Sequence, residues 1–200
     1  MAQLSGFSVA YGKSYQQPLH TGGEYIKSNP FSVEYSQYLH RFWSAAAQFQ
    51  YETGGFYDQQ HLSNPFQIVR VGGNINYWIL NDIRLLGKMA RSSCKGKLVA
   101  LVYKFRLYLS GGLYGNWLRS PANNIQKTYG SYSFGLGMNM YQFAISKYPM
   151  RSNSSTKYLI IPFVTANYIG GFKPVSLLPD EQLKVAQLEF KVGLKLGFGF

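Results

Sequence analysis

The residues in this chain that could carry out acid–base or nucleophilic chemistry are few. Three histidines, His20, His40 and His61, and a single cysteine, Cys94, are the candidates for a general base or a nucleophile. A hydrolytic site pairs a histidine with a serine or an aspartate in a fixed geometry, but each histidine falls in a predicted loop or turn without such a partner on a strand. Cys94 has no second cysteine with which to form a disulfide and is interpreted as an incidental thiol. We therefore expect no catalytic, cofactor-binding or metal-ligating residues.

The most regular pattern in the chain is at its carboxyl-terminal end, in residues 182–200 (QLKVAQLEFKVGLKLGFGF). Every even position from Ala186 to Phe200 is apolar, whereas the odd positions are polar, charged or glycine. This period of two predicts a β-strand with one apolar and one polar face. Strands of soluble proteins usually run about 3 to 10 residues, and a tilted strand that crosses a bilayer needs about 9 to 11 residues in the hydrocarbon. The length of the pattern favours a membrane-crossing strand.

Seven further segments alternate in the same way, and they predict strands at 6–13, 31–38, 42–52, 75–89, 98–117, 129–145 and 157–173. Longer connections are predicted at 14–30, 53–65, 119–128 and 174–181, short turns at 39–41, 91–96 and 147–156, and either strand or loop at 66–74. An even number of antiparallel strands with alternating long and short connections is typical of outer-membrane barrels. Closure of the sheet also leaves no strand edge exposed to lipid.

Alternation alone does not show which face points into the barrel, because the strands of a lipocalin-like barrel also alternate, with an apolar lumen and an exterior in contact with water. The composition of the polar face decides between the two. This face consists mainly of Gly, Ser, Ala, Asn and Gln, unlike the Lys and Glu mixture of a soluble surface. Charged residues make up only 14% of the chain, against about 25% in soluble domains. The sequence therefore predicts an all-β protein, an eight-stranded antiparallel transmembrane β-barrel formed by residues 1–200 as a single domain.

Other classes of protein are disfavoured by the same composition. No run of 18 apolar residues is present, so no membrane-spanning helix is expected. The first residues lack a charged region followed by an apolar stretch, and we expect a mature form whose secretory leader has been removed. The formal net charge of +12 raises the question of nucleic-acid binding. Because the basic residues are spread along the whole chain without a recognisable motif, we expect no nucleic-acid partner.

Charged side chains on the inward faces of the predicted strands define the first candidate site. An eight-stranded barrel is only wide enough for side chains to fill its interior, and an unpaired buried charge costs several kcal/mol. We expect an ion-pair plug that fixes the shape of the barrel; the alternative is a narrow anion-selective path. The predicted lumen network comprises Glu34, Asp82, Arg84, Lys88, Lys104, Arg106, Glu189, Lys191 and Lys195.

Basic residues in or beside the three short turns define the second candidate site. With a periplasmic carboxyl terminus, these turns lie in the periplasm, and no Asp or Glu accompanies the basic residues there. Contact with phospholipid headgroups is one interpretation, and a docking surface for an acidic periplasmic partner is the other. The predicted basic rim comprises Arg41, Arg91, Lys95, Lys97, Lys147, Arg151 and Lys157.

The second half of the chain also resembles a known family. Residues 77–88 (YWILNDIRLLGK), a basic turn, residues 102–117 (VYKFRLYLSGGLYGNW) and residues 168–172 (YIGGF) are similar to PorT-like outer-membrane barrels of the Bacteroidota, which are themselves OmpX-like. Tyr108, Gly112, Tyr114 and Gly115 approximate an aromatic-rich motif of that family. The resemblance implies a non-enzymatic barrel, with some members in secretion or envelope-assembly machinery. It also implies that the terminal Phe200 is the signal recognised for barrel assembly.

These observations lead us to expect a monomeric barrel in the outer membrane of a Gram-negative bacterium. The expected function is that of a structural or accessory subunit of an envelope complex, in secretion, barrel assembly or nutrient uptake. The alternatives are a narrow anion-preferring pore and an outer-membrane enzyme that modifies lipid A with a histidine and a serine or aspartate. The expected partners are outer-membrane lipid and lipopolysaccharide, the barrel-assembly machinery during biogenesis, and other envelope proteins.

Overall fold

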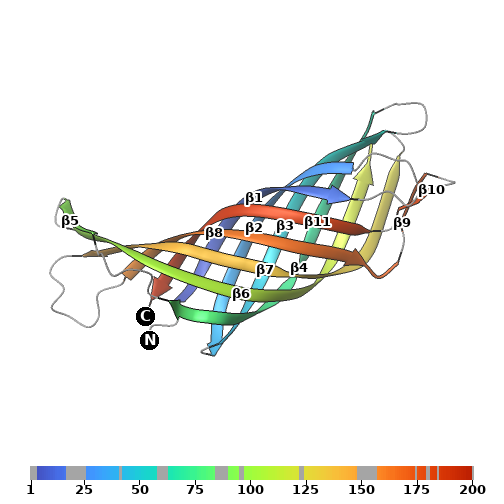
Figure 1. Cartoon of the computed structure of the whole chain (residues 1–200). Helices are drawn as coiled ribbons and strands as arrows, with labels where there is room; N and C mark the ends of the chain where they lie inside the picture. Colours follow the sequence, from blue (N-terminus) through green and yellow to red (C-terminus); the bar gives the residue numbers. More distant parts are fainter. Residues whose placement is uncertain are drawn as a thin grey trace.

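The chain folds into a single closed sheet (Figure 1). The computed structural model describes residues 4–16, 26–40, 42–57, 63–83, 90–94, 97–121, 124–147, 157–173, 175–178, 181–183 and 185–199. The barrel wall consists of eight strands: β1 (Leu4–Gln16), β2 (Ile26–His40), β3 (Trp43–Tyr57), β4 (Ser63–Ile83), β6 (Lys97–Ser120), β7 (Ile125–Lys147), β8 (Lys157–Gly171) and β11 (Ala186–Gly199). No helix in the described part of the chain is long and apolar enough to cross a membrane.

Antiparallel pairing between consecutive wall strands builds the sheet, and pairing of the first strand with the last closes it. β1 pairs with β11 along its whole length, from Leu4 opposite Gly199 to Gln16 opposite Gln187. β4 pairs directly with β6, while β5 (Ala90–Cys94) extends the sheet on the free side of β6. β9 (Val175–Leu178) and β10 (Glu181–Leu183) form a small hairpin within the connection from β8 to β11. The predicted eight-stranded antiparallel barrel is confirmed.

Most strands are longer than the sequence predicted. β2 begins at Ile26, inside the predicted loop 14–30, and it contains Pro30, for which the β1–β2 register has no partner. Because proline lacks an N–H, the ladder with β1 is interrupted there while the ladder with β3 continues through Pro30 and Glu52. The ambiguous segment 66–74 lies entirely within β4. Arg91, placed by prediction in a turn at 91–96, lies in β5.

The connection between β6 and β7 is shorter than the predicted loop 119–128. β6 ends at Ser120 and β7 begins at Ile125. Asn124 has a φ of 48°, in the left-handed region that asparagine tolerates better than most residues. Its N–H donates to the carbonyl oxygen of Pro121 at 3.4 Å, so a proline and an asparagine bring the longest two strands together within a tight turn.

The barrel has its apolar residues on the outside and its polar residues on the inside. The outward side chains of β1, β2, β3, β4, β6, β7 and β11 are mostly large, apolar and exposed: Phe7, Val9, Tyr11, Phe31, Val33, Tyr35, Trp43, Phe49, Val71, Ile75, Leu109, Leu113, Trp117, Phe134, Leu136, Phe190, Val192, Leu194 and Leu196. Such a continuous apolar surface is far larger than a monomeric soluble protein exposes to water. It is the surface of a barrel in contact with lipid.

The two ends of the barrel differ. The end that holds both chain termini also holds the β2–β3, β5–β6 and β7–β8 connections (Figure 1). The opposite end, here called the loop end, holds the β1–β2, β3–β4 and β6–β7 connections and the β9–β10 hairpin. β6 has 24 residues and β7 has 23, whereas β1 has 13. The β5–β6–β7 sheet consequently projects beyond the rest of the wall at the terminal end (Figure 1).

Candidate functional site

The middle of the lumen contains a network of buried charges that comes from three strands. Glu52 is on β3, Arg70 on β4, and Glu189 and Lys191 on β11, each at an inward position fixed by the alternation of its strand. The side chains of Glu52, Arg70 and Glu189 are each only 1% exposed. Charges excluded from water to this degree must be paired and hydrogen-bonded.

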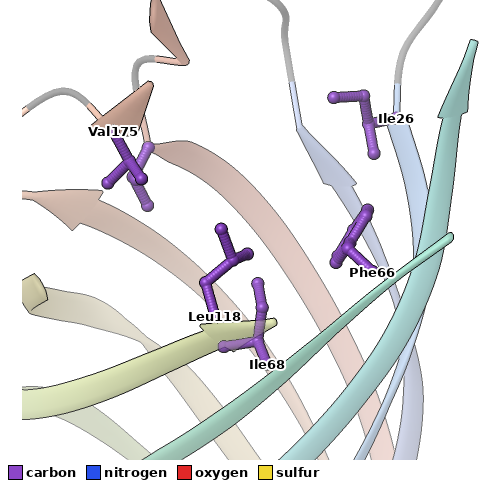
Figure 2. Close-up of a cluster of buried hydrophobic side chains, with 6 residues drawn as sticks. Ile26, Phe66, Ile68, Leu118 and Val175 are labelled. Atoms are coloured by element: carbon purple, nitrogen blue, oxygen red, sulfur yellow. The ribbon is translucent and has the colours of Figure 1, made fainter. Parts of the chain in front are cut away.

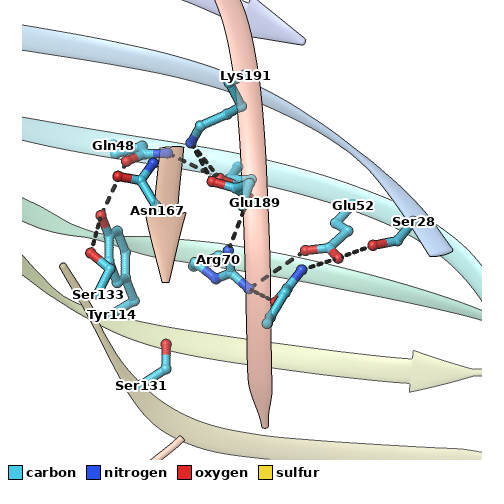
Figure 3. Close-up of polar contacts among 12 residues, drawn as sticks. Ser28, Gln48, Glu52, Arg70, Tyr114, Ser131, Ser133, Asn167, Glu189 and Lys191 are labelled. Carbon is cyan, nitrogen blue, oxygen red and sulfur yellow. Dashed lines mark hydrogen bonds and ion pairs between the residues drawn. The ribbon is translucent and has the colours of Figure 1, made fainter. Parts of the chain in front are cut away.

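Arg70 is the centre of this network (Figure 3). Its guanidinium lies 3.5 Å from the Glu52 carboxylate and 3.6 Å from that of Glu189. It also donates from Nε to Asn116 Oδ1 at 2.8 Å and from Nη2 to Gln187 Oε1 at 3.1 Å. Arg70 therefore connects four other inward side chains across the lumen, and its planar set of five N–H donors suits that position.

The two carboxylates have additional donors besides Arg70. Lys191 Nζ lies 2.8 Å from Glu189 Oε1, and Gln50 Nε2 donates to Glu189 Oε2 at 2.6 Å. Gln187 Nε2 donates to Glu52 Oε1 at 2.5 Å, and the Ser28 hydroxyl donates to the same oxygen. A buried ion-pair network with its remaining lone pairs occupied is the arrangement that offsets the cost of removing charges from water.

A neutral hydrogen-bonded layer adjoins the charged one. The Tyr114 hydroxyl donates to Gln48 Oε1 at 3.2 Å and also contacts Asn74 Oδ1. It accepts a hydrogen bond from Ser133 Oγ at 3.4 Å, and Asn74 Nδ2 donates to Gln48 Oε1 at 3.0 Å. These side chains come from β3, β4, β6 and β7, so the layer connects four strands through the interior (Figure 3).

At the loop end the lumen becomes apolar. Inward side chains from β2, β4 and β6 meet Val175 and Val185 of the β8–β11 connection, and Figure 2 shows them converging inside the wall. The cluster, called here the apolar cap, consists of Ile26, Phe66, Ile68, Leu118, Val175 and Val185, with Tyr129 packed against it. A cavity of about 10 Å³ lies among these side chains, which is room for about one water molecule. The apolar cap separates the charged network from the solvent at this end.

Towards the terminal end, aromatic rings and further charges line the lumen. Trp78 lies between Tyr38 and Tyr108, with ring centroids 5.4 Å and 4.7 Å away. Trp78 Nε1 donates to Ser44 Oγ at 3.1 Å. Arg106 and Lys195 both contact Tyr38, through a hydrogen bond and a cation–π contact respectively.

The structure brings part of the predicted lumen network together. Glu189 and Lys191 form an ion pair in mid-lumen, whereas Glu34, Arg106 and Lys195 face the lumen nearer the terminal end. Asp82 lies in β4 and Lys104 in β6, at points where shifts interrupt the register with the neighbouring strand, and the structure does not describe their side chains. Arg84 and Lys88 lie outside the described residues.

Sequence reasoning missed two of the three most buried ions of the network, Glu52 and Arg70. Glu52 was assigned to the polar face of its strand but was left out of the predicted network. Arg70 was hidden in the ambiguous segment 66–74, because Phe66 and Ile68 of the apolar cap share its face and Gly72 and Gly73 follow it. The sequence did contain a signal for an inward Arg70. This arginine lies between two valines and is separated by an even number of residues from Asn74 and Asn76, which places all three on the same face of a strand.

The basic rim is described only through the backbone. Lys97 and Lys147 lie directly opposite each other on β6 and β7, and Lys157 begins β8 opposite Gly199. Arg91 lies opposite Ala100 in the projecting sheet. These positions are all at the terminal end, while the remaining predicted residues, Arg41, Lys95 and Arg151, and the assembly signal Phe200 lie outside the described residues.

Of the three histidines, the structure describes only His40. His40 is an exposed residue at the terminal end of β2, and His20 and His61 lie outside the described residues. Within the described part of the chain, no group of three or more His, Cys, Asp or Glu side chains is arranged to hold a metal ion.

Comparison with known proteins locates this architecture among solved structures. OprG from Pseudomonas aeruginosa, an outer membrane protein, matches 100% of this chain and 98% of its own, with 9% sequence identity and a TM-score of 0.51. The chain has the fold of a bacterial outer-membrane barrel. Ail, the attachment invasion locus protein of Yersinia pestis, matches 100% of both chains with 16% identity and a TM-score of 0.45. Neisserial surface protein A matches 95% of this chain and 96% of its own, with 12% identity and a TM-score of 0.47.

No protein-family model matches the sequence, and no curated protein matches it. The similarity to solved structures concerns the fold, and the predicted resemblance to PorT-like proteins stays a prediction.

Proposed function

We propose that this chain is a non-enzymatic barrel of the bacterial outer membrane that acts as a structural or accessory subunit of an envelope complex, in secretion, barrel assembly or nutrient uptake. In this proposal the carboxyl terminus and the projecting β5–β6–β7 sheet face the periplasm. Lipopolysaccharide and phospholipid surround the wall, and the barrel-assembly machinery inserts it.

The observation that carries the proposal is the filled lumen. The apolar cap at the loop end is followed by the network around Arg70, and both span the interior between opposite strands. An ion that crossed the barrel would have to leave water at the apolar cap and separate buried ion pairs, and each step costs several kcal/mol. This arrangement supports the ion-pair plug over the narrow pore, and planar-bilayer recordings of the purified protein are expected to show no discrete conductance.

The projecting sheet supports the role of a subunit. A barrel that only spans the membrane does not need β6 and β7 to exceed β1 by about ten residues, the difference between 24 or 23 residues and 13. The sheet places Lys97 opposite Lys147, and like charges at directly opposed positions are unfavourable. An acidic surface on a partner would relieve that repulsion, which is why we assign the docking role to this end.

A gentle detergent extraction followed by capture of this protein tests the proposal. The wild type is expected to bring a stoichiometric set of envelope proteins, and the double variant Lys97→Glu/Lys147→Glu is expected to lose it. The matched control is Lys13→Glu/Lys27→Glu, which reverses two exposed lysines on neighbouring strands at the loop end. Retention of the same set by both double variants would remove the docking role from the projecting sheet. A wild-type protein that is extracted alone would overturn the subunit proposal.

A further inference from the structure

Among the described residues, the terminal side of the lumen has more cationic than anionic side chains. The described inward ions are Arg70, Lys191, Arg106 and Lys195 against Glu34, Glu52 and Glu189. In mid-lumen, Arg70 and Lys191 are paired with two carboxylates. Nearer the termini, only Glu34 remains among the described residues to face both Arg106 and Lys195.

Neither of these two cations uses a described carboxylate as its hydrogen-bond acceptor. Lys195 Nζ donates to the Ser36 hydroxyl and lies 5.8 Å from the centroid of the Tyr38 ring. It is within electrostatic reach of both Glu34 and Arg106. Two cations that face the same space without a matching number of carboxylates attract an anion into it.

Arg106 has a free donor at this point. Its Nη1 donates to the Tyr38 hydroxyl at 3.3 Å, and its buried Nε has no hydrogen-bond partner. A buried donor without an acceptor is unfavourable, and a bound water or ion is one way in which such a donor is satisfied. The guanidinium presents its N–H donors in a planar fork that matches the oxygens of a carboxylate or a phosphate.

The described side chains of this region differ in exposure from those of the charged network. Glu34, Tyr38 and Arg106 are partly exposed, whereas Arg70 and Glu52 are buried. The rings of Tyr38, Trp78 and Tyr108 pack together, and Tyr38 contacts both Arg106 and Lys195. Among the described residues, this region is therefore more exposed than the charged network beyond it.

We propose that the terminal half of the lumen is a blind-ended binding site for a small oxyanion, a carboxylate or phosphate group, held by Arg106 and Lys195 against the Tyr38 ring. The anion accepts hydrogen bonds from Arg106 Nε and from Lys195. It enters and leaves at the terminal end and does not cross the barrel. This site depends on the barrel interior and not on the docking role proposed above.

Trp78 provides an internal reporter for the test. The chain has three tryptophans, and the other two, Trp43 and Trp117, are exposed on the outer surface. In a Trp43→Phe/Trp117→Phe background, the fluorescence of Trp78 is measured in zwitterionic micelles with three quenchers: anionic iodide, cationic caesium and neutral acrylamide. Iodide is expected to quench Trp78 more strongly than caesium. Inorganic phosphate is expected to suppress quenching by iodide and to leave quenching by acrylamide unchanged.

Variants then assign the effect to the two cations. Arg106→Gln and Lys195→Gln are each expected to weaken phosphate competition about tenfold, since a hydrogen bond to a charged group contributes roughly 1.4 kcal/mol or more. Arg106→Lys keeps the charge but loses the planar fork, so it should keep the preference for iodide and weaken the competition by phosphate. Arg119→Gln, on the outer surface at the loop end, is the control and should change neither.

Unchanged acrylamide quenching shows that a variant is still folded around Trp78. Equal quenching by iodide and caesium in the parent protein would overturn the proposal. A preference for iodide that persists in both Gln variants would overturn it as well. Neither result bears on the capture experiment, so failure of this site and failure of the subunit proposal are distinguishable.

Discussion

Replacement of Arg70 by methionine measures what the buried network contributes to the folded barrel. Arg70 is 1% exposed and provides ion pairs to Glu52 and Glu189 and hydrogen bonds to Asn116 and Gln187. In Arg70→Met, Glu189 keeps Lys191 at 2.8 Å, but Glu52 has no other cation among the described residues. Removal of one partner from a buried ion pair costs about 3–5 kcal/mol, and we expect a loss in this range.

A second substitution separates the electrostatic effect from lost packing. Glu52→Gln keeps the size of the side chain and removes the charge that Arg70→Met leaves unpaired. The double variant is therefore expected to be more stable than the sum of the two single losses predicts, with a coupling energy of about 0.5–3 kcal/mol. The free energies are measured by urea-induced unfolding in detergent micelles, followed by tryptophan fluorescence.

The control for this cycle is Arg119→Met, at an exposed outward position of β6. It should change the free energy of unfolding by less than about 0.5 kcal/mol, as surface substitutions usually do. The reasoning is refuted if Arg70→Met loses less than about 1 kcal/mol. It is also refuted if Glu52→Gln and Arg70→Met are additive, because the two side chains would then not be coupled.

Two further predictions concern the close packing of the lumen and the lipid-facing wall. A Cβ at Gly137 would overlap the Tyr108 ring, whereas a Cβ at Gly111 would have its nearest atom 3.9 Å away. Gly137→Ala should therefore lower the free energy of unfolding in urea by about 1–3 kcal/mol. Gly111→Ala should lower it much less. Val192 is 66% exposed at the middle of β11, so Val192→Lys should lose about 2–4 kcal/mol when unfolding is measured in lipid vesicles. Gln126→Lys, exposed at the loop end of β7, should have little effect.

The outward face of the barrel was predictable from the sequence because lipid imposes one requirement on it. On β11 the apolar residues at even positions face outward and Gln187, Glu189 and Lys191 face inward, as predicted. The same assignment holds for Phe7 and Val9 on β1. A strand with lipid on one side and a polar lumen on the other produces a clear period of two.

The ends of the strands were not predictable because the lumen is not polar throughout. Phe66, Ile68 and Leu118 face inward in the apolar cap, so strands that contain them are apolar on both faces at the loop end. This is why 66–74 was ambiguous and why the predicted connection at 119–128 began too early. At the terminal end, register shifts between Trp78 and Leu80 break the alternation, so the prediction that Asp82 faces the lumen depends on a spacing that the strand does not keep.

The charged network also explains how such a barrel maintains its strand register. A shift by one residue moves every side chain of a strand to the opposite face. In a soluble protein the apolar core opposes that shift, because apolar side chains would move into water. In this barrel apolar side chains are accommodated both by the lipid outside and by the apolar cap inside, so they oppose the shift less. A slip of β4 would move Arg70 into the lipid, where a basic side chain near the midplane costs about 2–4 kcal/mol. Smaller penalties of the same sign apply to Glu52 on β3 and Glu189 on β11. A buried ion pair often adds little net stability over an apolar replacement, so its main contribution here is to make the alternative registers of three strands unfavourable.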